Sequence, residues 1–291
     1  MMFNGYNEEL VQTIKGWLQE DVGSGDITTR TTIPQGHESK GIIHAKEDGV
    51  ICGIPVAELV FEIVDPSLVF TPLVQEGEQI TKGTVIAEVE GSTHAILTGE
   101  RLALNLMQRL SGVATRTSAF VRELNGLPTR LVDTRKTTPG HRMLEKYAVR
   151  IGGGANHRFG LYDAVMIKDN HIKGAGGIRQ AVGRARANIP HTMTIEVETE
   201  SLEQVEEALS AGADIIMLDN MSPALMKEAV SRIKAKSPHV KTEASGNVSL
   251  ETVRVIAESG VDVISVGRLT YSFASLDISL DLNARKEEQS I

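Results

Sequence analysis

The sequence has one cysteine and few aromatic residues. The single Cys52 among 291 residues excludes an internal disulfide and any metal site built from several cysteines. Phe, Trp and Tyr make up 4% of the chain, and its formal net charge is −8. Nucleic-acid binding relies on basic surface and stacking platforms, so we expect no nucleic-acid partner.

Long apolar runs are also missing. No stretch approaches the roughly 20 apolar residues of a membrane-spanning helix, and acidic residues occur too early for a signal peptide. Hydrophobic residues (41%) and charged residues (23%) are mixed throughout, as in compact domains. Together with the low cysteine content, this predicts a cytoplasmic protein without membrane contact, long enough for two domains.

The second half of the sequence repeats a unit of an apolar, β-branched run, a polar or glycine residue, and a helical stretch. The six runs are 131–135, 164–168, 193–198, 214–219, 241–245 and 262–267. Buried parallel strands that alternate with helices produce this pattern. DAVMIKDN at 163, DIIMLDN at 214 and DVISVGR at 262 resemble one another two units apart, which favours a closed barrel over an open sheet. Helices with a serine N-cap are expected at 201–213 and 249–261.

The first hundred residues have a different pattern. Short alternating apolar runs separated by glycines indicate antiparallel strands and turns, and the pattern becomes helical from Leu97. We therefore predict an α/β protein with an incomplete, TIM-like β/α barrel at 106–268. An N-terminal α+β sandwich domain is predicted at 1–105, and the C-terminal segment 269–291 is expected to rejoin it.

The predicted strand ends carry a segregated set of charges, and in β/α barrels this rim holds the active site. Nine Lys and Arg face four Asp and Glu between residues 130 and 173 of an acidic protein. The first two strand ends and the loop GGGANHR contribute bases, the next two contribute acids, and the last two contribute small polar residues. In that order, the candidates are Arg135, Lys136, His157, Arg158 and Lys168; Glu198 and Asp219; and Ser245, Gly246, Asn247 and Gly267.

Each group of candidates suits a different part of a multiply anionic small molecule. Guanidinium and ammonium groups bind carboxylates and phosphates. Glu198 and Asp219 suit Mg²⁺ or sugar hydroxyls, and Glu196 shares the strand face of Glu198 at a deeper level. Glycine at strand ends lets backbone N–H groups approach a phosphate. The absence of a P-loop and of a GxSxG motif excludes the corresponding kinase and hydrolase interpretations.

Eight segments between residues 20 and 270 carry a pattern that barrel architecture alone does not explain. They are EDVGSGDITT, GERLALNLMQRLSGVAT, DTRKTTPGHRMLEKYAV, GGGANHRFGLYDAVMIKDNH, IEVE, GADIIMLDN, EASGNV and VDVISVGRLT. Together and in this order they resemble the quinolinate phosphoribosyltransferases, also called nicotinate-nucleotide pyrophosphorylases (carboxylating). The resemblance implies transfer of phosphoribosyl from 5-phosphoribosyl 1-pyrophosphate to quinolinate with Mg²⁺, giving nicotinate mononucleotide, pyrophosphate and CO₂ in NAD biosynthesis.

The same resemblance implies roles for the site residues. The quinolinate carboxylates would be held by Arg135, His157, Arg158 and Lys168. Lys136 would join Lys168 toward the pyrophosphate, with Thr137 also binding substrate. Glu198 and Asp219 would hold the ribose hydroxyls and Mg²⁺, and Ser245, Gly246, Asn247 and Gly267 the 5′-phosphate. The family forms homodimers, so Arg101 would complete the site of the neighbouring subunit.

Two alternatives remain open from the sequence. One is a paralogous transferase that accepts another acidic ring on the same fold. The other is a non-catalytic sensor of anionic metabolites, because a fold does not fix a function. The carboxylates of Glu198 and Asp219 argue against the sensor, since a protein that only binds an anion gains nothing from them.

Overall fold

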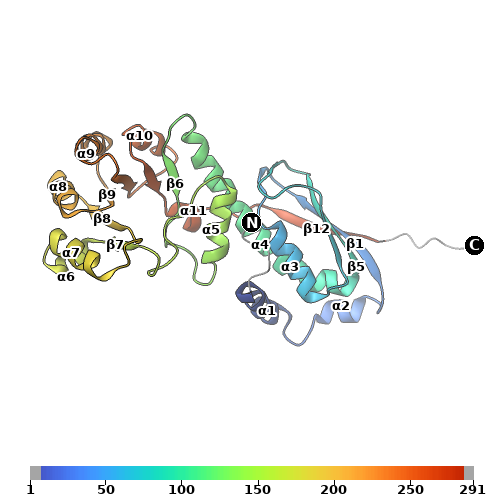
Figure 1. Ribbon diagram of the computed structural model, residues 1–291. Coiled ribbons are helices and arrows are strands. Elements are labelled where there is room, and N and C mark those ends of the chain that lie inside the picture. Colours follow the sequence, from blue (N-terminus) through green and yellow to red (C-terminus); the bar gives the residue numbers. More distant parts are fainter. Residues whose placement is uncertain (1–7, 285–291) are drawn as a thin grey trace, which may run out of the picture. The chain divides into compact units, whose positions relative to one another are not determined.

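The computed structural model describes residues 8–284, which form two compact units (Figure 1). Of these, residues 8–116 and 273–284 form the N-terminal unit, and Thr117–Ser272 form the barrel unit. The division falls inside the long helix α4 (Thr93–Glu123), beyond the expected boundary at residue 105. Residues 1–7 and 285–291, at the outer ends of the expected ranges 1–105 and 269–291, lie outside the described residues.

The N-terminal unit is built around an antiparallel sheet of order β12-β1-β5-β3. Its strands are β1 (Glu38–Ala45), β3 (Val69–Pro72), β5 (Val85–Ser92) and β12 (Ile278–Ala284), and a separate pair joins β2 (Gly49–Val50) to β4 (Gln79–Ile80). Its shorter helices are α1 (Glu8–Val22), α2 (Ile27–Thr32) and α3 (Ile54–Val64). The expectation of antiparallel strands and turns is confirmed.

Strand β12 confirms that the C-terminal segment rejoins this unit. It pairs with β1 in a continuous register from Ser39 opposite Ala284 to Ala45 opposite Ile278. Ile43 and Ala45 of β1 and Ile278 of β12 are buried, as alternate residues of a half-buried strand should be. The sheet thus combines strands from opposite ends of the chain.

The barrel unit contains one parallel sheet of order β6-β11-β10-β9-β8-β7. Its strands are β6 (Arg130–Val132), β7 (Val165–Ile167), β8 (Ile195–Thr199), β9 (Ile215–Asp219), β10 (Lys241–Ser245) and β11 (Val263–Ser265). Its helices after α4 are α5 (Arg142–Ile151), α6 (Asp169–Ala175), α7 (Ile178–Asn188), α8 (Leu202–Ala211), α9 (Pro223–Lys236), α10 (Val253–Ala257) and α11 (Arg268–Tyr271). All six predicted strands are confirmed, and Figure 1 shows α7 to α10 on the outside of the curved sheet.

The prediction that the barrel is closed is wrong, although the incomplete TIM-like architecture is confirmed. No ladder joins β6 to β7 within residues 8–284. Instead, the loop after α5 lies beside β6: the Ala155 N–H donates to the Leu131 carbonyl at 2.8 Å, and the Asp133 N–H donates to the Ala155 carbonyl at 3.2 Å. The loop that carries His157 and Arg158 therefore pairs with the edge strand at the open side of the barrel.

One of the two predicted helices is confirmed, and the other is shorter than expected. Helix α8 follows the N-cap Ser201, whose hydroxyl accepts the Gln204 N–H, and it ends at Gly212 in the left-handed conformation, as expected. The helix expected at 249–261 is shorter and begins only at Val253. The Ser249 N–H donates to the Thr252 hydroxyl at 2.9 Å, and this local turn replaces the first helical turn.

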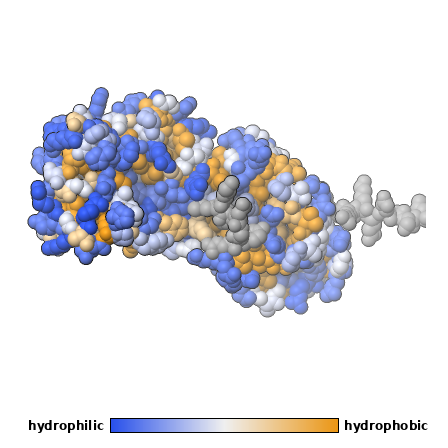
Figure 2. Space-filling view, viewed as in Figure 1, coloured by the Kyte–Doolittle hydropathy of each residue, from blue (hydrophilic) through white to orange (hydrophobic). Residues whose placement is uncertain are grey.

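The described residues include no helix that is both long enough and apolar enough to cross a membrane. On the face drawn in Figure 2, hydrophobic residues form broad areas on the N-terminal unit.

Candidate active site

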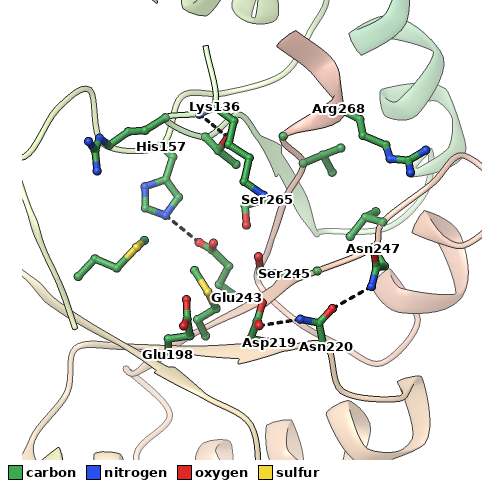
Figure 3. A pocket seen from close by; sticks show the side chains of 18 of the residues that line it. Lys136, His157, Glu198, Asp219, Asn220, Glu243, Ser245, Asn247, Ser265 and Arg268 are labelled. Atoms are coloured by element: carbon green, nitrogen blue, oxygen red, sulfur yellow. Dashed lines mark hydrogen bonds and ion pairs between the residues drawn. The ribbon is translucent and has the colours of Figure 1, made fainter. Parts of the chain in front are cut away.

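A cavity of about 690 Å³ opens at the carboxyl ends of the parallel strands of the barrel unit (Figure 3). Every strand of this sheet has a residue that lines the cavity, either within the strand or no more than two positions after its end. Parallel strands bring their carboxyl ends to one rim, so residues far apart in the sequence meet here. The rim of the barrel is the candidate active site.

Eleven of the thirteen site residues predicted from the sequence line this one cavity. They are Arg135, Lys136, His157, Arg158, Lys168, Glu198, Asp219, Ser245, Gly246, Asn247 and Gly267. Thr137 is not among the lining residues, and its hydroxyl accepts a hydrogen bond from Arg142 Nε at 3.0 Å. Arg101 lies on α4 in the N-terminal unit, where its side chain is 59% exposed and 3.9 Å from Glu100.

A buried ion pair holds the loop that carries His157 and Arg158. Asp133, directly after β6, and Lys146 on α5 are 0% and 1% exposed and form a short charge-assisted hydrogen bond. Asp133 also accepts the Asn156 side-chain amide at 2.6 Å and the His157 N–H at 2.9 Å. Burial raises the pKa of Asp133. Lys146 and these hydrogen bonds stabilise the carboxylate and so oppose this rise. Sequence analysis missed this pair.

The cationic side of the cavity includes two guanidinium groups near each other. Arg158 Nη1 donates to the Ala164 carbonyl at 3.0 Å, which anchors one edge of its planar group. Burial and the positive charge of Arg135 lower the pKa of Arg158. Two like charges in a partly buried place disfavour each other, and an anionic ligand between them would relieve that repulsion.

Lys168 and Glu198 form an ion pair across the rim. Lys168 Nζ lies 2.6 Å from Glu198 Oε2, and the two side chains are 45% and 12% exposed. The Lys168 N–H donates to His171 Nδ1 at 3.0 Å, just before α6 begins. Glu198 lines the cavity and Glu196 does not, in agreement with the expected deeper position of Glu196. A ligand that binds Lys168 must compete with Glu198.

His157 and Glu243 line the cavity and form a cluster with the deeper Glu196. His157 Nε2 lies 3.3 Å from Glu196 Oε2 and 3.2 Å from Glu243 Oε2, and both glutamates are 3% exposed. Burial lowers the pKa of His157, but hydrogen bonds and charge from Glu196 and Glu243 outweigh it and raise the pKa to about 10. Burial raises the pKa of Glu196.

Glu243 is a residue that sequence analysis missed, although a signal was present. It precedes Ser245 by two positions on β10, so the strand period of two places both on the inner face. The same alternation relates Glu196 to Glu198 on β8. Other lining residues that the prediction omitted are Thr134, Met166, Met217, Asn220, Val248, Ser265, Val266, Arg268 and Tyr271.

Asp219 is held by a chain of side-chain amides at the ends of β9 and β10 (Figure 3). Asn220 Nδ2 donates to Asp219 Oδ2 at 2.7 Å, and Asn247 Nδ2 donates to Asn220 Oδ1 at 3.1 Å. Both asparagines have positive φ, 53° and 49°, which asparagine tolerates better than most residues. Gly246, which precedes Asn247, has a φ of 91°, and a Cβ there would lie 2.2 Å from Asn220 Oδ1. This cluster fixes the Asp219 carboxylate and leaves room for nothing larger than glycine.

We predict that Gly246→Ala impairs the site more than the fold. The new methyl group displaces Asn220 and imposes a strained φ, at a cost of about 1–3 kcal/mol in unfolding free energy. Asn220 then loses its amide contact with Asp219. The Michaelis constant for the ligand held by Asp219 should therefore rise at least roughly tenfold. Thermal unfolding and steady-state kinetics measure the two effects.

Gly183→Ala is the matched control, because a Cβ at this position of α7 meets nothing within 4 Å. It should leave the Michaelis constants unchanged and add up to about 1 kcal/mol of stability through helix propensity. Equal kinetics in Gly246→Ala and the wild-type protein would show that Asn220 does not position Asp219.

Comparison with known proteins agrees with this architecture. The family model of the quinolinate phosphoribosyl transferase C-terminal domain matches residues 113–281, and that of the N-terminal domain matches residues 26–111. The chain belongs to the quinolinate phosphoribosyl transferase family. The resemblance inferred from the motifs is thereby confirmed, while the roles of the individual residues stay predictions.

Two relatives and one solved structure illustrate the similarity. The chain is 51% identical over 213 residues to a "Probable nicotinate-nucleotide pyrophosphorylase [carboxylating]" from Synechocystis sp., covering 73% of this chain and 72% of the relative. It is 45% identical over 279 residues to a protein of the same description from Bacillus subtilis, covering 96% and 95%. The crystal structure of NadC from Streptococcus pyogenes matches with a TM-score of 0.91 at 42% identity, covering 95% and 97%.

Proposed function

We propose that the protein transfers the phosphoribosyl group of 5-phosphoribosyl 1-pyrophosphate to quinolinate and releases pyrophosphate and CO₂, forming nicotinate mononucleotide for NAD biosynthesis. One observation carries the proposal for this chain. A single cavity is lined by Arg135, Lys136, Arg158 and Lys168 and also by the carboxylates Glu198 and Asp219. Cations suit the carboxylates and phosphates of the two substrates, and the acids suit the ribose hydroxyls. Family membership supports the same activity.

Quinolinate is held by the cationic side of the cavity. Arg135 and Arg158 offer paired donors to its two carboxylates, and Lys168 adds a point charge. Lys168 becomes available when its contact with Glu198 opens, so binding exchanges one carboxylate partner for another. Met166 and Met217 also line the cavity and supply apolar surface for the ring.

The first chemical step is a displacement at ribose C1. The ring nitrogen of quinolinate forms the new bond as the pyrophosphate leaves with the bonding electrons, through an oxocarbenium-like state. The protein needs no nucleophile of its own for this step, but it must orient the ring nitrogen and stabilise the leaving group. The positive charges of Lys136 and Lys168 stabilise the leaving pyrophosphate. The 5′-phosphate is held by Ser245, Gly246, Asn247 and Gly267.

The second step follows from the charge of the alkylated ring. The carboxylate on C2 leaves as CO₂ and its bonding electrons stay on C2, next to the positive nitrogen. C2 then takes a proton from water. Arg135 and Arg158 hold the other carboxylate and keep the ring in place during this step.

Glu198 and Asp219 would hold Mg²⁺. Carboxylate oxygens on the rim of an anion-binding cavity are the donors that this ion prefers, with phosphate oxygens and water completing its shell, so the residues present fit the ion. When bound, Mg²⁺ neutralises charge on the departing pyrophosphate. Asn220 keeps one oxygen of Asp219 in place for this contact.

The homodimer implied by the resemblance is part of the proposal, with the partner subunit's Arg101 completing the cavity. In this chain Arg101 is exposed, and its Nη2 lies 3.9 Å from Oε1 of its neighbour Glu100. Ile27, Val69, Leu73 and Val85 are exposed apolar side chains of the N-terminal unit, and their burial in a dimer would be favourable. A cytoplasmic location stays a prediction.

The purified protein with quinolinate, 5-phosphoribosyl 1-pyrophosphate and Mg²⁺ tests the function. We expect loss of quinolinate with one CO₂ released per nicotinate mononucleotide, and no turnover when nicotinate replaces quinolinate. Turnover of another acidic ring in preference to quinolinate would favour the paralogous transferase. Quinolinate binding without turnover would favour the sensor.

Arg158→Ala is predicted to impair quinolinate use selectively. Loss of a partly buried charge partner should cost about 2 to 5 kcal/mol in kcat/KM for quinolinate. Arg179→Ala, an exposed base on α7, is the matched control and should have wild-type kinetics. An Arg158→Ala enzyme with an unchanged KM for quinolinate would remove this residue from the binding site.

Subunit mixing tests the shared site. Arg101→Ala and Lys168→Ala proteins, each inactive alone, should regain roughly a quarter of wild-type activity when unfolded and refolded together. Half of the dimers formed at random are mixed, and each mixed dimer contains one intact site. A mixture of Lys168→Ala with Arg158→Ala is the control and should regain none, because both changes lie in the barrel unit. No recovery in purified mixed dimers of the first pair would contradict the shared site.

A further inference from the structure

Arg268 lines the cavity but has no role in the two chemical steps described above. It follows Gly267 directly and is the first residue of α11. Its side chain is exposed, and within residues 8–284 its guanidinium group forms no hydrogen bond or ion pair with the protein. A guanidinium group has five N–H donors. At the rim of a binding cavity, all five are available to a ligand.

The part of the rim beside Arg268 is neutral. In the proposed function, the residues that hold the 5′-phosphate are Ser245, Gly246, Asn247 and Gly267. A Cβ at Gly267 would lie 2.8 Å from the Tyr271 ring and 2.9 Å from Cδ of Lys136, so only glycine fits there. A phosphate monoester carries about −1.5 to −2 charges at neutral pH. Backbone N–H groups and amides offer it partial charges, whereas charge-assisted hydrogen bonds are about twice as strong as neutral ones.

The other lysines and arginines of the cavity come from a different part of the sheet. Arg135 and Lys136 follow β6, Arg158 lies on the loop after α5, and Lys168 follows β7. The proposed function assigns them to the quinolinate carboxylates and to the departing pyrophosphate. None of these four is assigned to the phosphate at the other end of the ribose.

Arg268 lies where a cation for the 5′-phosphate is required. It follows β11, and the neighbouring strand β10 ends at Ser245, so both strands lead into the residues that hold this phosphate. Figure 3 shows Arg268 on the same side of the view as Asn247, with His157 on the opposite side. A change of side-chain rotamer costs little at an exposed position and would bring the guanidinium group over the phosphate.

We propose that Arg268 binds the 5′-phosphate of 5-phosphoribosyl 1-pyrophosphate and keeps this contact in nicotinate mononucleotide. Its paired donors match two phosphate oxygens, and it adds a full positive charge to the neutral residues around it. The 5′-phosphate is the charged group of this substrate that the reaction leaves unchanged. Arg268 therefore holds the ribose while the bond at C1 is exchanged. The proposal rests on the proposed function, which supplies the ligand.

Two ligands that differ only in the 5′-phosphate test this contact by isothermal titration calorimetry. They are nicotinate mononucleotide and nicotinate riboside, and the ratio of their dissociation constants measures the contribution of the phosphate. Arg268→Ala should reduce the preference for the mononucleotide at least roughly tenfold, because charge-assisted hydrogen bonds are lost. The affinity for the riboside should stay at the wild-type value. An unchanged ratio would overturn the proposal.

Lys136→Ala is the opposite comparison, because the side chain of Lys136 passes close to Gly267. It should weaken the binding of pyrophosphate and leave the ratio for the other two ligands unchanged, since contacts with separate groups are independent. Arg179→Ala, an exposed base on α7, should change neither quantity. A ratio that falls in Lys136→Ala and not in Arg268→Ala would assign the phosphate to Lys136 and overturn the proposal.

Steady-state kinetics provides a second measurement with two further variants. Arg268→Gln removes the charge but keeps a long polar side chain, and it should raise the KM for 5-phosphoribosyl 1-pyrophosphate at least roughly tenfold while the KM for quinolinate stays unchanged. Arg268→Lys keeps the charge without the paired donors, so its KM should lie between those of Arg268→Gln and the wild-type enzyme. A wild-type KM in Arg268→Gln would contradict the contact, even if Arg268→Ala failed to fold.

The binding ratio does not require turnover, so this proposal and the proposed function fail separately. An inactive wild-type protein whose ratio still falls in Arg268→Ala would overturn the proposed function and support the phosphate contact. An active enzyme with an unchanged ratio in Arg268→Ala would overturn the phosphate contact alone.

Discussion

The buried contact between Lys146 and Asp133 is the interaction on which the cationic side of the cavity depends. A six-stranded sheet leaves the barrel open between β6 and β7, and the loop after α5 lies beside β6 at that side. Two loop residues, Asn156 and His157, are held by the carboxylate of Asp133, and Lys146 neutralises its charge. A buried carboxylate without such a cation would be severely destabilising, so this ion pair allows polar groups to organise a loop inside the protein.

Some of the charges in the described cavity are paired within the protein, whereas Arg135 and Arg158 disfavour each other. Lys168 is paired with Glu198, and His157 is paired with two glutamates. Substrates with several negative charges therefore replace internal partners, and the net electrostatic gain is smaller than a count of cations suggests. This replacement of internal partners makes binding selective for ligands with several acidic groups. A ligand with fewer acidic groups cannot compensate for the contacts that it breaks.

Periodicity and strand-end position were sufficient to predict much of the molecule. All six parallel strands were located, and the rim rule brought Arg135 and Asp219 to one cavity although 84 positions separate them in the printed sequence. Sequence patterns could not reveal the open side of the barrel, because similar repeats occur in closed and open sheets. They also could not show that helix α10 begins late, since Ser249 is a plausible N-cap until its N–H is seen to bond Thr252.

The missed residues have a shared physical reason. Asp133 and Lys146 meet only after a strand, a helix and a loop have folded around them, and no spacing in the sequence records that encounter. Glu243 is different, because the alternation on β10 that places Ser245 inward also places Glu243 inward. Thr137 was carried over from the resemblance, and the structure pairs it with Arg142 outside the lining of the cavity.

The pairing of β12 with β1 has a consequence for the order in which the chain acquires structure. During synthesis the sheet of the N-terminal unit lacks its edge strand until residues 278–284 leave the ribosome, after every strand of the barrel unit has emerged. The exposed edge of β1 is open to pairing with other chains during this interval. The barrel unit can therefore mature first, and completion of the N-terminal sheet becomes a late event in biogenesis, when the whole chain is available.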